Sequence, residues 1–546
     1  MRLRLFLAAG LLLGAAAQAG VLPKAGGVAQ PQIPMALTHH YDNNRTGWNP
    51  LETTLTPANV GGITIKHTVT LLEQVDNQPL FVPSYYLTGH PDGLIYIADA
   101  GNNIYRIDPS SGVIINQANF GTPVPYTALP GAGACTDNGL NIGITSTPVI
   151  DPIARRLYFI AYTFPSSINT YVLHAVDMDT LADVVSPRTV PASGILSDSS
   201  TYAFDAAVSR QRPGLLLTPD GNLYAGFGSF CDFATNTTRG WLLGWKASTL
   251  APLSTPSYLL NQNATIAGSF FLTSIWQSGF ALAADSASNI YFNSGNSSDV
   301  SGSYNSPFNL SESAYKISAG MAGVSTFFTP SNQNTLDTAD ADLTGGGLML
   351  LPNPVSGVNV ALTSGKSNPL FLLNRDSMGG LGGQIASYAT LGYGNGGPTY
   401  WVGSDGVGRI ALLSGDGSIG GPSGGTNQLQ IWKVQAGPTL AIEHTSPILP
   451  NAGGFSFNSH PGAISTVSSN SINNAIIWLT IRPGNRGAGS SDNVMLYAMD
   501  PTNLATPLFS AVAGVWTAMC QANTVPIVMN GRVFVATYKQ LNIFGL

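Results

Sequence analysis

Arg212 and Trp276 are the two side chains whose chemistry is most informative about a ligand. An arginine fork holds a carboxylate or a phosphate through two parallel hydrogen bonds. A tryptophan face stacks on a planar cofactor, a sugar or a cation. Each residue stands just before a short apolar stretch, in RPGLLLTP from Arg212 and in WQSGFALAA from Trp276. Packing between neighbouring structural units is the alternative role for both.

Other polar side chains occupy the same place relative to similar apolar stretches, and Lys366 in GKSNPLFLLNRD is close enough to reach an anion bound there. The candidate ligand- or cofactor-binding set is Gln78, Thr145, Arg212, Trp276, Gln277, Lys366, His460 and Gln521. The alternative for each is a structural role, because buried polar groups at strand ends hydrogen-bond their neighbours. The sequence assigns no catalytic residue.

The three cysteines, Cys135, Cys231 and Cys520, are too few to hold a chain of this length together. Cys135 and Cys231 both follow polar loop segments, and we interpret them as a candidate disulfide that leaves Cys520 unpaired. A metal site is the weaker alternative, because His174 and His460 have no ligand spacing relative to the cysteines.

The stretch HHYDNNRTGWNP, residues 39–50, invites two interpretations. The adjacent His39 and His40 suggest a metal ligand, but this pair alone is unspecific. Arg45, with Asn43 and Asn49, instead predicts a hydrogen-bonded clasp over one end of the fold. We favour the clasp and assign no metal.

LDTADADLTGGG places Asp337, Asp340 and Asp342 close together. As an EF-hand loop the segment fails, because counting from Asp340 puts Leu351 where the bidentate glutamate belongs. A calcium site in the loop and ordinary aspartate-rich turn chemistry both remain open.

The elements that must position these side chains follow from a repeat, with successive starts about 50 to 70 residues apart. Its first strand recurs in QPLFVP, STPVID, RPGLLLTP, SGFALAA, GGGLMLLP, GGPTYWVG, HPGAISTV and NTVPIV. A turn and a second strand follow, as in DGNLYAGFGS, and often a third, as in LLGWKASTL. Each unit therefore makes one small antiparallel sheet.

Such a sheet cannot bury either face alone, so the copies must stack. Eight copies predict an all-β, eight-bladed β-propeller of four-stranded blades. Tandem immunoglobulin-like sandwiches need longer units and β-solenoids shorter ones. We expect residues 63–72 to close the ring beside residues 541–546, since closure removes exposed strand edges. The candidate residues before the first strands then face the central mouth.

The first residues predict export. Arg2 and Arg4 precede an apolar run that ends in Ala17-Gln18-Ala19, the pattern of a secretory signal peptide. We expect a signal peptide over 1–19, an N-terminal extension and clasp over 20–62 and the propeller over 63–546. This organisation implies a secreted or periplasmic protein, a mature chain without a transmembrane segment and, by default, a monomer. A net charge of −6 without a basic run argues against a nucleic-acid partner.

YDNNRTGWNPLETTLTPANV, CTDNGLNIGITSTPVIDP, IWQSGFALAAD and LNIFGL resemble secreted bacterial propellers of the pyrroloquinoline quinone (PQQ) repeat class. The resemblance implies the eight-bladed fold of quinoprotein alcohol dehydrogenases. For dehydrogenase members it also implies PQQ in the mouth, a calcium or lanthanide ion held by Glu, Asn and Asp, a catalytic Asp and often adjacent cysteines. In this sequence the cysteines are never adjacent, and none of the four glutamates opens an inner strand.

Two functional hypotheses follow. The first is an exported propeller without an evident redox-cofactor site, which binds a small molecule, a glycan or an envelope protein at its mouth. The second is a PQQ-dependent oxidoreductase acting on an alcohol or sugar, with calcium or a lanthanide. In that case Arg212, Trp276, Gln277 and Lys366 hold the quinone, and an unassigned Asp takes the substrate proton. We favour the first.

Overall fold

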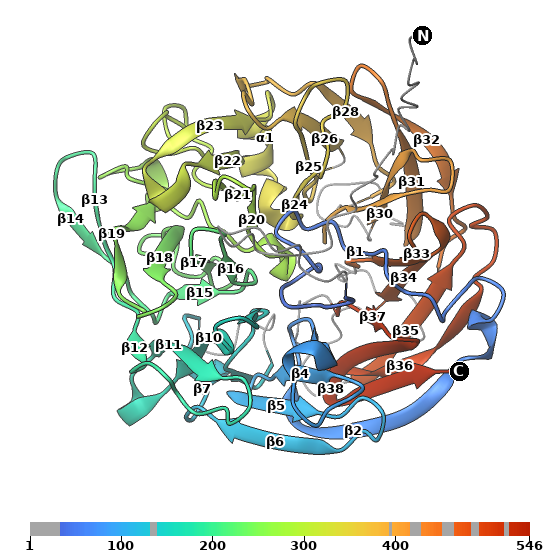
Figure 1. The fold of residues 1–546 in the computed structure, drawn as a ribbon. Coiled ribbons are helices and arrows are strands. Elements are labelled where there is room, and N and C mark those ends of the chain that lie inside the picture. The colour runs from blue at the N-terminus through green and yellow to red at the C-terminus, as the bar shows by residue number, and fades with distance from the viewer. Residues whose placement is uncertain are drawn as a thin grey trace, which may run out of the picture.

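The structure, a computed structural model, describes residues 33–131, 139–367, 369–392, 396–414, 427–449, 463–481, 491–517 and 524–546. Within these residues, eight sheets of three to five strands follow one another round a ring in chain order (Figure 1). Neighbouring strands within a blade pair antiparallel. The predicted eight-bladed β-propeller is confirmed.

In each of the first four blades, the strands follow one another in chain order from the centre of the ring outward. Blade 1 holds β3 (Leu80–Val82), β4 (Leu94–Ala98), β5 (Asn103–Ile107) and β6 (Ile114–Asn119). Blade 2 holds β9 (Val149–Asp151), β10 (Arg156–Thr163), β11 (Thr170–Asp177) and β12 (Arg188–Thr189). Blade 3 holds β15 (Ser209–Gln211) with β16 (Leu216–Leu217), then β17 (Asn222–Ser229), β18 (Trp241–Lys246) and β19 (Pro252–Leu259). Blade 4 holds β20 (Ala283–Ala284), β21 (Ile290–Asn293), β22 (Ala314–Ile317) and β23 (Val324–Thr329).

The other four blades follow the same order. Blade 5 holds β24 (Leu348–Leu350), β25 (Val360–Thr363), β26 (Pro369–Asn374) and β28 (Ala386–Ala389). Blade 6 holds β29 (Thr399–Val402), β30 (Gly408–Ser414), β31 (Gln428–Gln435) and β32 (Thr439–Thr445). Blade 7 holds β33 (Thr466–Asn470), β34 (Asn473–Ile481), β35 (Ser491–Met499) and β36 (Phe509–Thr517). Blade 8 holds β37 (Ile527–Met529), β38 (Arg532–Gly545) and β2 (Thr64–Gln74).

Short elements link or extend the blades. β1 (Trp48–Asn49) pairs parallel with β33, and β27 (Gly380–Leu381) pairs parallel with β23. The hairpins β7 (Val124–Pro125) with β8 (Asn141–Ile142), and β13 (Ser193–Ile195) with β14 (Thr201–Ala203), stand apart from the blades. The α-helix is α1 (Gln333–Thr338), and the short 3-10 turns include η6 (Gln277–Gly279) and η8 (Leu343–Gly345). No helix among the described residues has the length and apolar character to span a bilayer.

The hydrophobic core lies between the blades. Strands β4 and β5 are buried along their whole lengths, whereas the outer strand β6 alternates between half-buried and exposed residues. A middle strand has a neighbouring blade on each face, so both of its faces are apolar. Trp241, Trp401, Trp432 and Trp478 are almost completely buried and fill spaces between blades.

Blade 8 closes the ring with strands from both ends of the chain. β2 pairs antiparallel with β38, with Thr64 opposite Gly545 and Val69 opposite Leu541. The expected closure by residues 63–72 and 541–546 is confirmed. Covering the edge of β38 removes a row of unpaired backbone groups that could recruit other chains.

Residues 36–49, the hub segment, occupy the centre of the ring (Figure 1). The segment hydrogen-bonds to the innermost strand of every blade. Its partners are Phe81 of β3, Ile150 of β9, Leu217 of β16, Ala284 of β20, Leu350 of β24, Tyr400 of β29, Val467 of β33 and Val528 of β37. Inner strands leave one edge unpaired, and buried backbone groups need partners. The hub segment supplies those partners.

Arg45 organises the hub segment. Its buried guanidinium donates to the carbonyl oxygen of Leu282 through Nε and Nη2, and to the main-chain oxygens of His39 and Asp42 through Nη1. The hydrogen bonds of Arg45 thus hold the hub segment together and join it to the inner strands within the ring, whereas the clasp was expected over one end of the fold. Both ring nitrogens of His40 lie 2.7 Å from carbonyl oxygens, so His40 is not free to bind a metal ion. The ring nitrogens of His39 are buried and have no hydrogen-bond partner.

Candidate functional site

The candidate site lies at the end of the ring where the inner strands begin, here called the mouth. In an antiparallel blade the second strand ends where the first begins. Loops that precede an inner strand therefore share this end with loops between the second and third strands. Trp276 stands in a loop of the first kind, and Arg212 lies between β15 and β16, the two short inner strands of blade 3. Lys366 lies between β25 and β26, in a loop of the second kind.

Arg212, Trp276 and Lys366 meet at this end, between blades 3 and 5. The guanidinium carbon of Arg212 lies 5.2 Å from the centroid of the Trp276 ring, and Nζ of Lys366 lies 5.3 Å from it. Both cations are buried, whereas the Trp276 ring is half-buried. A tryptophan face attracts cations and planar groups alike. We call these three residues the mouth platform.

Two carboxylates stand beside Lys366. Its Nζ lies 2.6 Å from Oδ2 of Asp342 and 3.1 Å from Oδ1 of Asp340. Asn296 links the same pair, because its backbone N–H donates to Oδ1 of Asp342 and its side chain donates to Oδ1 of Asp340. Asp342 is buried, but the Asp340 side chain is 45% exposed. Asp340 is thus the member of this pair that solvent can reach.

Three further acidic groups belong to the same cluster. Burial raises the pKa of Asp337 to about 8, and it raises the pKa of Glu312 well above its usual range. Burial, followed by the charge of Asp342, also raises the pKa of Asp232. A group whose charged form is costly binds its proton more tightly. At neutral pH, protonation therefore reduces the negative charge of this cluster.

Asp340 is poised near neutral pH. Burial is the largest cause that raises its pKa, followed by the charge of Asp342, while Lys366 opposes both, and the result is a pKa of about 7. A general base or acid works best when its pKa is near the operating pH. Asp340 therefore has the protonation behaviour that proton transfer at the mouth would need.

Three other predicted residues make hydrogen bonds with the hub segment, with a neighbouring blade or within their own blade. Gln78 accepts a hydrogen bond from the backbone of His40 in the hub segment. Thr145 donates to the carbonyl of Gln211, and Gln277 accepts from the backbone of Asn293. All three predicted side chains are buried. Each is engaged as the structural alternative expects, and none belongs to the mouth platform.

Of the remaining predicted residues, Cys231 lies within the part of the chain that the structure describes. His460, Gln521 and Cys135 lie outside the described residues. Cys231 is half-buried and takes part in a disulfide. The pairing of Cys231 with Cys135 stays a prediction.

The sequence alone did not reveal the carboxylates at the mouth. Apart from Lys366, the predicted mouth ligands were assigned to positions just before an inner strand, whereas Glu312 and Asp232 lie in loops between second and third strands. Asp340 and Asp342 are close together in the sequence, but their contact with Lys366 depends on how two loops pack against each other. Among the described residues, the loops bring to Lys366 a set of carboxylates that the sequence alone did not assemble.

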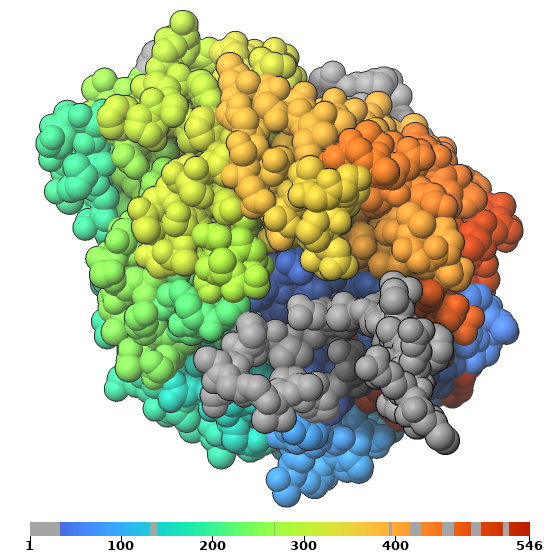
Figure 2. Space-filling model, turned by 45° about the horizontal axis from the view of Figure 1, so that its top comes forward, coloured from blue at the N-terminus to red at the C-terminus, as the bar shows by residue number. Residues whose placement is uncertain are grey.

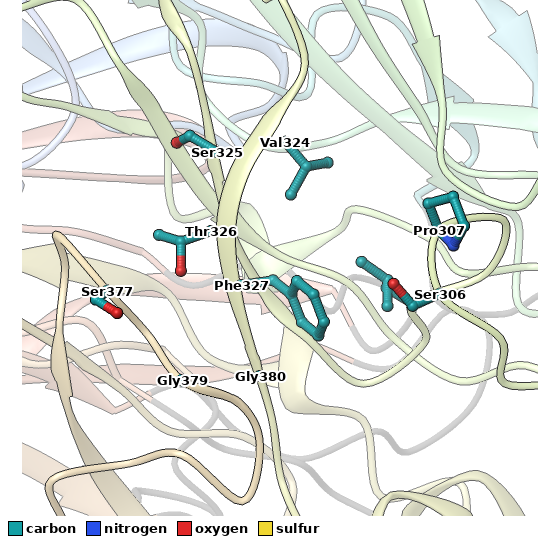
Figure 3. A pocket seen from close by; sticks show the side chains of 10 residues that line it. Ser306, Pro307, Val324, Ser325, Thr326, Phe327, Ser377, Gly379 and Gly380 are labelled. Carbon is teal, nitrogen blue, oxygen red and sulfur yellow. The ribbon is translucent and has the colours of Figure 1, made fainter.

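Two surface pockets lie away from these residues. A pocket of about 380 Å³ lies beside β23, where Val324 and Phe327 point toward Ser306 and Pro307 (Figure 3). A second, of about 240 Å³, is bordered by residues of blades 6 and 7 that include Trp401. No member of the mouth platform borders either pocket. In the middle of the ring, part of the hub segment is visible in dark blue between the blades (Figure 2).

The chain resembles two solved structures over most of its length. A europium-containing methanol dehydrogenase matches with a TM-score of 0.59 and 10% identity, over 94% of this chain and 98% of that one. The fold is that of the quinoprotein dehydrogenases. A quinohemoprotein alcohol dehydrogenase from Pseudomonas putida HK5 matches with a TM-score of 0.56 and 10% identity, over 94% of this chain and 80% of that one. No family model and no curated protein sequence matches the chain.

At 10% identity the likeness to the quinoprotein dehydrogenases is one of fold. Function must therefore be argued from the site. The mouth platform fits a planar anion such as PQQ, since it combines an aromatic face with two cations. The oxygen atoms fit an additional metal ion less well, because most of them already accept hydrogen bonds from the protein.

Proposed function

We propose that this protein binds a planar, anionic small molecule at its mouth. The observation that carries the proposal is the mouth platform, in which the buried cations Arg212 and Lys366 both lie against the half-exposed ring of Trp276. A planar ligand would stack on the exposed part of the ring, and its carboxylates would pair with the cations.

A PQQ-dependent oxidoreductase is the second candidate. Asp340 favours it, since this partly exposed carboxyl group has a pKa of about 7 and lies 3.1 Å from Nζ of Lys366. PQQ is a planar quinone that carries carboxylates and supplies the oxidation chemistry when bound. In this function Trp276 and Arg212 hold the quinone, and Asp340 takes the proton of an alcohol hydroxyl.

The test is direct binding by equilibrium dialysis. The probes are PQQ, the redox-inactive planar acid trimesate, and glucose as an uncharged sugar. We expect PQQ and trimesate to bind and glucose not to bind. Trp276→Leu should weaken binding about tenfold, which corresponds to about 1.4 kcal/mol. Tyr85→Leu is the matched control, because Tyr85 is a largely exposed aromatic residue outside the mouth platform.

Each outcome has a clear consequence. Binding of neither planar acid to the wild-type protein would refute the proposal. Unchanged affinity in Trp276→Leu would show that the site lies elsewhere. Reduction of a dye by alcohols in the presence of bound PQQ, lost in Asp340→Asn, would establish the second candidate.

A further inference from the structure

Lys366 is held in place by its backbone as well as by its side chain. Its backbone N–H donates to the carbonyl oxygen of Asp342 over 2.9 Å, in addition to the ion pair between their side chains. The preceding residue, Gly365, makes the close approach possible, because a Cβ there would lie 2.5 Å from the same carbonyl oxygen. The loop after β25 is therefore shaped to deliver an ammonium group to Asp342.

The carboxylate oxygens around Lys366 are largely committed to protein donors. Oδ1 of Asp342 accepts from the backbone of Asn296 over 2.8 Å, and Oδ1 of Asp337 accepts from the backbone of Ser297 over 3.0 Å. Oε2 of Glu312 accepts from the backbone N–H of Leu343 over 2.5 Å, whereas its Oε1 is buried without a hydrogen-bond partner. Calcium needs six to eight oxygen ligands that converge on one point. Among the described residues, no three acidic, histidine or cysteine side chains are placed to hold a metal ion.

The electrostatic surroundings keep the ammonium group charged. Burial lowers the pKa of Lys366, but the carboxylates of Asp342 and then Asp340 more than compensate, so the pKa lies above its ordinary value. The charged group lies 5.3 Å from the centroid of the Trp276 ring. A fixed positive charge thus stands between the carboxylates and the surface that would carry a ligand.

We infer that Lys366 serves as the built-in cation of the mouth, with its ammonium group against Asp340 and Asp342 where a bound metal ion would otherwise be needed. Ligand binding at the mouth platform is then independent of divalent and trivalent metals. This inference rests on the proposed function for its ligand. It concerns this chain's own residues and differs from the metal-assisted site that the resemblance implies.

Metal binding is tested first, on the unmodified protein. Terbium bound near Trp276 would emit when the indole is excited, so terbium luminescence reports occupancy of the carboxylates. We expect no such emission from the wild-type protein. We also expect the dissociation constant for trimesate to change less than twofold between EDTA and excess calcium or lanthanum. Neither measurement depends on a variant that must fold.

Removing the ammonium group of Lys366 should weaken ligand binding and allow terbium to bind. Lys366→Ala should weaken trimesate binding at least tenfold and gain terbium emission, because Asp340 and Asp342 lose their counter-ion. Adding Asp342→Asn should abolish that emission. Lys366→Arg should keep ligand binding without terbium emission. Lys316→Ala is the matched control, since Lys316 forms an ion pair with Asp376 outside the mouth.

The outcomes separate this inference from the proposed function. Terbium emission from the wild-type protein that Asp342→Asn removes would overturn the inference. So would trimesate or PQQ binding that EDTA abolishes and calcium or lanthanum restores. If no planar acid binds under any condition, the proposed function fails, and this inference loses its ligand and fails with it.

Discussion

The guanidinium of Arg45 donates two hydrogen bonds to the carbonyl oxygen of Leu282, a residue 237 positions further along the chain. This contact ties the hub segment to blade 4. Other hydrogen bonds of the same segment reach the remaining blades. The N-terminal segment is therefore part of the propeller's structure, although it precedes the first blade in sequence.

Arg45→Lys should destabilise the protein. A lysine cannot reproduce the guanidinium geometry, so buried carbonyl groups such as that of Leu282 lose their donors. Each unsatisfied buried group costs about 1–3 kcal/mol, and we expect a total loss of about 3 kcal/mol. The midpoint of urea unfolding measures the effect. The same change at the half-buried Arg375 is the control, and an equal shift in both variants would contradict a special role for Arg45.

Gly47→Ala should be more costly than an equivalent change at a loop glycine. A Cβ on Gly47 would lie 2.4 Å from the His40 ring, at a φ of +69°. Gly406 has a φ of +75° but open space around it. Both variants incur the backbone cost of about 1 kcal/mol, and only Gly47→Ala adds the steric clash. Thermal unfolding of the two variants gives the comparison, and equal midpoints would show that His40 moves freely.

The stability of the folded state should fall as the pH rises from about 4 to about 8, with a contribution from Asp337. Its ordinary pKa of 3.8 is raised to about 8 in the fold, mainly by burial. Between these values the folded state holds a proton that the unfolded state has released, so the free energy of unfolding decreases with pH.

Asp337→Asn should flatten this dependence. We expect the variant to gain stability relative to the wild type at about pH 8 but not at about pH 5, measured by urea unfolding. Asp405→Asn is the contrasting control, because hydrogen bonds from Arg409 and Lys433 lower the pKa of Asp405. Parallel pH curves for wild type and Asp337→Asn would exclude a proton on Asp337.

The disulfide of Cys231 should join it to Cys135. Peptide mapping of the protein without reduction is expected to give a linked pair containing these residues, with Cys520 accessible to alkylation after unfolding. A linked Cys231–Cys520 peptide would contradict the pairing inferred from sequence. Reduction should then shift the linked pair to two separate masses.

The fold was predictable because its signal repeats. Each of the eight blades has an inner strand that lies within or overlaps a predicted stretch, from β3 at Leu80–Val82 to β37 at Ile527–Met529. The strands β33 and β37 extend beyond their stretches, and β15 precedes its own. Even the pairing of β2 with β38 follows from the need to cover a strand edge. These features depend on local patterns that recur or on a general property of sheets.

The mouth was predictable only in part. Residue type and position near the inner strands identify Arg212, Trp276 and Lys366 as candidates, and the structure brings these three residues together. The contact of Lys366 with Asp342 joins two loops that are not part of the repeated strand pattern, so the repeat does not predict it. Glu312 lies in a loop at a φ of +53°, which no sequence pattern indicates. Contacts between docked loops produce no periodic pattern in the sequence.

Residues 36–49 hydrogen-bond to every inner strand, so a segment of the chain itself occupies the axis of the described ring. We therefore expect a molecule bound at Trp276 to enter and to leave through the mouth. Substrate entry and product release would then use the same opening. The rate of turnover would depend on how quickly a product leaves it.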